Sequence, residues 1–160
     1  AMHEGWHQYA QTALHSRLPA WLDEGLATNM EGFRMHTDGF EIDHTANRQR
    51  ERRYWWIKYR GRQIPLADLL RSDPHVALAK GSRSLLDYYA QVWAFMRFML
   101  ADDQRRGAIA AGLHHAATPG STPESTQQTI ELSLGQSLVS QQETYEAWAQ
   151  EHLTPSWWRD

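Results

Sequence analysis

Two histidines and a glutamate near the start of the chain have the spacing of a metal site. His3, Glu4 and His7 form an H-E-x-x-H sequence in residues 2–14, where apolar residues recur at helical spacing. Residues four apart share one helical face, so both imidazoles can bind one metal ion. Glu4 lies about a quarter turn away, where it can act as general base on a metal-bound water. The alternative is two histidines on a solvated helix face.

The next segment offers the third protein ligand that a catalytic zinc ion needs beside its open position. Residues 20–31 are predicted to form a second helix, which carries Glu24 in its first turns. Gly25 follows and lets another part of the chain come close. Two antiparallel helices can therefore surround one ion with the two histidines and Glu24. Asp23 is the competing ligand, and its other role would be a favourable charge near a helix N-terminus.

The composition is that of a globular chain and narrows the possible partners. The chain has 160 residues, of which 41% are hydrophobic and 22% charged, which suits one folded domain. The net charge of −3 disfavours a general nucleic-acid or anionic-membrane binder. The absence of cysteine excludes disulfides, zinc–thiolate sites and a cysteine nucleophile. No apolar run approaches the roughly 20 residues of a membrane span. We therefore expect no nucleic-acid partner and no membrane span.

The elements that must position the site are predicted to be mainly helical, with little β structure. Residues 84–100 are apolar almost all round and should form a central, buried helix. We expect a single domain over residues 1–160, with zinc-site helices over 2–31 and a further helical subdomain over about 65–153. Helices are predicted over residues 2–14, 20–31, 65–70, 84–100, 105–115, 123–134 and 141–153.

Several shorter signals predict local structure between these helices. Residues 54–59 (YWWIKY) are rich in strand formers and are predicted to form a short strand. The basic run over residues 48–53 is typical of a solvated helix face. Ser84 with Asp87, and Ser140 with Glu143, have the spacing of capping boxes. A loop is expected to begin at residues 73–74. Two tryptophans near the terminus, Trp157 and Trp158, are expected to pack back onto the domain or to meet a partner.

The first two segments together resemble the gluzincin metallopeptidases, the thermolysin-like branch of the zincins. The pairing of H-E-x-x-H with residues 19–27 (PAWLDEGLA) is most similar to the bacterial peptidase-MA-like proteins. Residues 64–70 (IPLADLL), 89–95 (YAQVWAF) and 138–153 are similar more loosely, with Val92 where serine is more usual. The resemblance implies the helical part of a zincin-like catalytic domain. It also implies a periplasmic or extracellular location, since relatives are often exported.

The resemblance also assigns roles to individual residues. It implies that His3, His7 and Glu24 bind Zn²⁺ and that Glu4 is the general base. Tyr89 is the expected donor to the oxyanion, with the adjacent Tyr88 as the alternative. A core role for either tyrosine is the competing interpretation.

The sequence departs from the family pattern in two places. Many gluzincins carry an aspartate four residues after the ligand glutamate, where this chain has Thr28. Thr28 or Glu31 is therefore expected to bind the second ring nitrogen of a ligand histidine. Zincins also place a small sheet before the H-E-x-x-H helix, and its edge strand holds the substrate. That sheet is not found here, so we expect a fragment whose partners include a missing N-terminal segment of the same protein.

Three functions from different classes follow from these patterns. The first is a zinc-dependent peptide-bond hydrolase acting on a peptide or protein substrate. The second is an inactive, zinc-stabilised binding module descended from such an enzyme. The third is a metal-free helical domain whose aromatic residues and basic run bind a partner.

Overall fold

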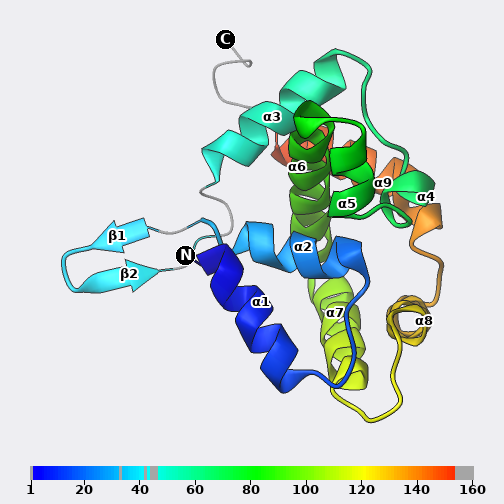
Figure 1. The fold of residues 1–160 in the computed structure, drawn as a ribbon. Helices are drawn as coiled ribbons and strands as arrows, with labels where there is room; N and C mark the ends of the chain where they lie inside the picture. The colour runs from blue at the N-terminus through cyan, green and yellow to red at the C-terminus, as the bar shows by residue number, and fades with distance from the viewer. Residues whose placement is uncertain (1, 33, 42, 44–46, 154–160) are drawn as a thin grey trace.

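The computed structural model describes residues 2–32, 34–41, 43 and 47–153, and this part of the chain is mainly helical (Figure 1). Strands β1 (Arg34–His36) and β2 (Gly39–Glu41) form an antiparallel hairpin that points away from the helices. The prediction of a mainly α chain with little β structure is confirmed. The helices are α1 (Met2–Ala13), α2 (Ala20–Asn29), α3 (Arg48–Tyr59), α4 (Leu66–Leu69), α5 (Pro74–Ala79), α6 (Ser82–Met99), α7 (Asp103–Ala116), α8 (Pro123–Leu134) and α9 (Gln142–His152), the last preceded by a 3-10 turn over Val139–Gln141.

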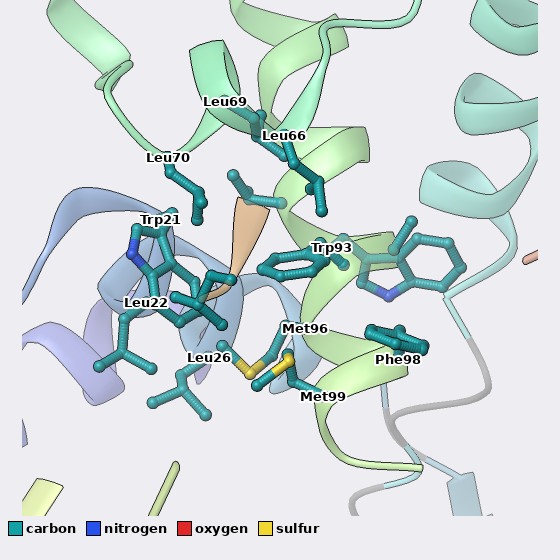
Figure 2. Packing of buried hydrophobic residues seen from close by; sticks show 14 of the residues in the cluster. Trp21, Leu22, Leu26, Leu66, Leu69, Leu70, Trp93, Met96, Phe98 and Met99 are labelled. Atoms are coloured by element: carbon teal, nitrogen blue, oxygen red, sulfur yellow. The ribbon is translucent and has the colours of Figure 1, made fainter. Parts of the chain in front are cut away.

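Helix α6 is the centre of the fold, as its apolar sequence predicts. Helices α2, α3, α5 and α9 all pack against it. Figure 2 shows the side chains of α2 meeting those of α6, with leucines from α4 and the residue after it closing the core. None of the described helices is both long and apolar enough to cross a membrane. The labelled core residues are Trp21, Leu22, Leu26, Leu66, Leu69, Leu70, Trp93, Met96, Phe98 and Met99.

The contact between α2 and α6 is close because a glycine lies at the crossing. A Cβ atom on Gly25 would lie 3.1 Å from Met96 Cβ and 3.3 Å from the carbonyl oxygen of Val92. The nearby Asn29 side chain is buried and donates to the carbonyl oxygens of Gly25 and Trp93, at 2.8 and 3.2 Å. The helix that carries the predicted third ligand is therefore fixed directly on the central helix.

The predicted strand over residues 54–59 is wrong, because this segment is the second half of α3. The aromatic residues favour a strand locally, but Tyr54 and Ile57, three apart, are both fully buried on one helical face. The side chain of Asn47 caps the helix by accepting the backbone N–H of Arg50. Tertiary burial and a good N-cap therefore outweigh strand propensity here.

The start of α5 was predicted as a loop, and this is also wrong. The Asp73 carboxylate accepts the backbone N–H of Val76 at 2.8 Å, and Pro74 occupies the first helical position. These are standard helix-start residues, and they begin a helix of six residues.

Neither predicted capping box forms. Helix α6 begins at Ser82, after Gly81 at φ +107°, and Asp87 is buried in ion pairs with Arg53 and Arg62 instead. The Ser140 hydroxyl donates to the carbonyl oxygen of Ser137, which precedes the 3-10 turn. In both cases the helix starts at a different residue, so the serine is out of position. The terminal Trp157 and Trp158 lie outside the described residues.

Gly32 allows two backbone segments to touch just after α2. The Asp43 N–H donates to the Gly32 carbonyl oxygen at 3.1 Å, and a Cβ on Gly32 would overlap the Asp43 carbonyl oxygen. We expect Gly32→Ala to lower the free energy of unfolding by about 1–3 kcal/mol, because backbone must move. Urea denaturation measures this. The matched control is Gly107→Ala, inside α7 with open space around it, which should stabilise by about 0.5–1 kcal/mol. Equal stability of the two variants would contradict the prediction.

Candidate metal centre

Helices α1 and α2 bring the predicted ligands together. Pro19 precedes α2 and turns the chain, so that the two helices pack side by side. The indole N–H of Trp6 donates to the Asp23 carboxylate at 2.7 Å, which ties the helices near the site. The backbone N–H of His15 donates to the Ala116 carbonyl oxygen, so the link between the helices is also anchored on α7. The site is thus built on two helices that are each fixed to the rest of the fold.

Three ligand atoms converge at this place. The Nε2 atoms of His3 and His7 are 3.2 Å apart. The Glu24 Oε2 atom lies 3.4 Å from His3 Nε2 and 3.6 Å from His7 Nε2. The three side chains are between 14% and 19% exposed, so the cluster is largely shielded from water. Among the described residues, these three form a group that could hold a metal ion.

The spacing of these atoms fits a tetrahedral zinc ion. With Zn–N and Zn–O bonds of about 2.0–2.2 Å, two ligands of a tetrahedral ion lie about 3.3–3.6 Å apart. The three observed separations match that edge length to within about 0.1 Å. Glu24 Oε2 is also buried without a hydrogen-bond partner in the described part of the chain. A buried carboxylate oxygen of this kind is expensive unless a cation or donor satisfies it.

Each of the two histidines has a carboxylate on its Nδ1 atom. His3 Nδ1 lies 3.0 Å from Glu31 Oε1, and His7 Nδ1 lies 3.2 Å from Asp23 Oδ1. A carboxylate only accepts, so each Nδ1–H donates, and the Nε2 atom of the neutral ring would be free to bind a metal ion. Asp23 therefore contacts His7 Nδ1 and lies outside the group of three ligand-type side chains. Thr28 instead donates to the carbonyl oxygens of Glu24 and Gly25 within its own helix. Of the two residues expected to support a histidine, it is thus Glu31 that does so.

Glu31 is itself held by residues that the sequence did not single out. The Arg50 guanidinium binds it through two nitrogens at 2.8 and 2.9 Å, and the Asn47 amide donates to it at 2.8 Å. Burial raises the pKa of Glu31, but the hydrogen bonds from His3, Arg50 and Asn47 outweigh it and lower the pKa to about 2. The carboxylate is therefore ionised at neutral pH. Arg50 belongs to the basic run that was predicted to be solvated, and that prediction is wrong for this member.

The electrostatics of the cluster favour a positive charge between the ligands. The carboxylates of Glu24 and Glu31 raise the pKa of His3 to about 9, against the opposing effect of burial. A proton on His3 thus balances the acidic groups when no metal ion is bound.

Glu4 lies beside the cluster and faces open space. Its side chain is exposed and lines a pocket of about 740 Å³ together with His7, Asp23 and Glu24. The pocket continues along residues 14–18 and the start of α5. Glu4 is therefore exposed to solvent and shares this pocket with His7 and Glu24.

The two candidate tyrosines have different surroundings. The Tyr89 ring is partly buried and lies 6.0 Å from the His3 ring, with the Arg50 guanidinium 5.2 Å from its centre. Burial first, and then the Glu24 charge, raise the pKa of Tyr89, which keeps the phenol protonated. Tyr88 is fully buried, and its hydroxyl points to the Ser72 carbonyl oxygen at 3.5 Å. Tyr89 therefore borders the cluster, whereas Tyr88 belongs to the core.

The fold and the site define a mainly helical protein with a two-histidine, one-glutamate cluster between its first two helices. Residues 1–120 match the model of the family described as "Protein of unknown function (DUF1570)". The chain belongs to that family. No curated protein and no solved structure matches the chain.

Proposed function

We propose that the chain is a zinc-dependent peptide-bond hydrolase of the gluzincin type. The observation that carries this proposal is the convergence of His3 Nε2, His7 Nε2 and Glu24 Oε2 at tetrahedral edge distances. Carboxylates on both Nδ1 atoms support it, since this arrangement is typical of zinc-bound histidines. The H-E-x-x-H sequence supplies the general base beside the ligands.

The chain's own residues would divide the chemistry as follows. Bound zinc would supply Lewis acidity, which lowers the pKa of a water molecule and polarises a carbonyl group. Glu4, on the pocket side, would accept a proton from the attacking water and pass it to the leaving amine. The protonated Tyr89 would donate its O–H to the oxygen that becomes negative. The pocket lined by Glu4 and His7 would hold the peptide next to these groups.

Digestion of a mixed peptide library, followed by mass spectrometry, tests the proposal. The chain loaded with one zinc ion should cleave a subset of the peptides, and removing the ion with a chelator should stop cleavage. Adding zinc back should restore it, which separates loss of the ion from damage to the chain. Cleavage that survives chelation and zinc removal would contradict a zinc-dependent mechanism.

A second candidate is a zinc-stabilised binding module without turnover. The observation that favours it is the small amount of sheet in the described residues, where two strands of three residues form a hairpin. A zincin holds its substrate by adding a strand to a sheet edge, and this hairpin offers a short edge. The module would bind zinc in the same cluster but would cleave no peptide in the library.

A further inference from the structure

A second groove lies on the exposed side of α3, against the start of α6. We call it the basic groove; it has a volume of about 580 Å³ and is lined by Arg48, Arg50, Arg52, Arg53, Trp56 and Leu86, among others. Arg48, Arg52 and Trp56 are spaced by four residues and so form one stripe along the helix. The groove does not include the proposed zinc ligands, although Arg50, which lines it, also binds Glu31 beside His3.

The basic groove carries more positive charge than its neighbours neutralise. Arg50 is paired with Glu31, and Arg53 shares Asp87 with Arg62. Arg48 and Arg52 are exposed, and no ion pair joins either of them to a carboxylate within the part of the chain that the structure describes. The nearest acidic residue on the helix is Glu51. Its strongest attraction is to Arg97 of α6, with weaker ones to Arg48 and Arg52.

The floor of the groove is partly apolar. Trp56 and Leu86 are 36% and 45% exposed, which is high for residues of this size. The guanidinium carbons of Arg53, Arg60 and Arg62 lie 4.7, 5.5 and 5.4 Å from the centre of the Trp56 ring. These three guanidinium groups already lie against the Trp56 ring, so the ring is poorly suited to stack on a nucleic-acid base.

We propose that the basic groove binds an acidic polypeptide segment that has an apolar side chain between its carboxylates. The carboxylates would pair with Arg48 and Arg52, and the apolar side chain would lie on Leu86 and the exposed part of Trp56. A short acidic segment fits a local basic patch on a chain whose net charge is −3, whereas a long polyanion would meet repulsion beyond the patch. This interaction requires no hydrolysis and stands apart from the proposed zinc chemistry.

Fluorescence anisotropy with a labelled, glutamate-rich peptide containing a central leucine tests the proposal on the full chain. The same peptide with every glutamate replaced by glutamine is the ligand control. We expect the acidic peptide to bind and the glutamine peptide not to, with affinity falling as salt concentration rises. The double variant Arg48→Gln/Arg52→Gln should bind about tenfold more weakly. The matched control is Arg71→Gln/Arg106→Gln, which removes two exposed arginines elsewhere and should bind as the unaltered chain does.

Several outcomes would overturn the proposal. These are no binding of the acidic peptide even at low salt, equal binding of the glutamine peptide, or equal weakening in both double variants. Tighter binding of a single-stranded oligonucleotide, or of vesicles containing anionic lipid, would assign the groove to a different partner. Circular dichroism shows whether each variant is folded. If the double variant does not fold, the single variant Arg48→Gln provides a milder test. The single variant should weaken binding in the same direction, and unchanged affinity would count against the proposal.

Discussion

Replacing His7 by alanine is expected to abolish the binding of one zinc ion per chain. The unaltered protein, purified without added metal, should contain about one zinc, because three ligand atoms already lie at the right separations. Removing His7 leaves two protein ligands, which are too few for a stable zinc site. Elemental analysis by mass spectrometry after extensive dialysis measures the ratio directly.

A matched control shows whether the loss is specific to the cluster. His75 lines the same pocket but lies outside the ligand group, so His75→Ala should keep its zinc. Glu24→Gln provides a nearly isosteric second variant, which should lose zinc without leaving a cavity. If both His7→Ala and Glu24→Gln retained zinc, the proposed ligand set would be wrong. No zinc in the unaltered protein, and none taken up on addition, would leave the metal-free helical domain as the remaining hypothesis.

Replacing Glu4 by glutamine is expected to slow peptide hydrolysis by orders of magnitude while leaving zinc content unchanged. Glu4 is exposed beside the cluster and is not a ligand, so the ion should remain. Glutamine has nearly the same shape but cannot accept the proton of the attacking water. General-base catalysis typically contributes about 10²–10⁴-fold, and the rate of peptide cleavage should fall by that order.

The control for this change is Glu124→Gln, which alters an exposed glutamate in the first turn of α8. It should cleave peptides at the unaltered rate. Full activity in Glu4→Gln would show that another group is the base. Zinc binding without any cleavage by the unaltered chain would favour the inactive binding module, because there would then be no hydrolysis for Glu4 to support.

Local patterns predicted most of the helices and the proximity of His3, His7 and Glu24, because both depend largely on short-range spacing. His3 and His7 are one helical turn apart, so their convergence follows from the helix alone. Glu24 required only that α2 fold back along α1, which the short link and Pro19 favour. The helix over residues 123–134 was predicted with the bounds that the structure shows.

The errors occur where distant parts of the chain decide the outcome. Arg50 appeared as one member of a charged run, but its contact with Glu31 exists only because the start of α3 comes close to the residues that follow α2. The strand propensity of residues 54–59 was overcome when Tyr54 and Ile57 were buried against the core. The strands of the hairpin have three residues each, which is too short for a clear alternating pattern. Thr28 donates within its own helix, and it is Glu31, three residues later, whose carboxylate contacts His3 Nδ1.

The close crossing of α2 on α6 has a consequence for the order of folding. His3 and Glu31 are 28 residues apart, whereas Asn29 and Trp93, which join the two helices, are 64 apart. Loop closure costs more for the longer separation, so the first two helices can meet before the central helix docks. Until Gly25 reaches Met96, however, α2 is held only by its contacts with α1, such as the hydrogen bond from Trp6 to Asp23, and Glu24 is not yet fixed against the central helix. The proposed ion would therefore bind more tightly to the state in which α2 is docked on α6 than to an early pair of α1 and α2 alone.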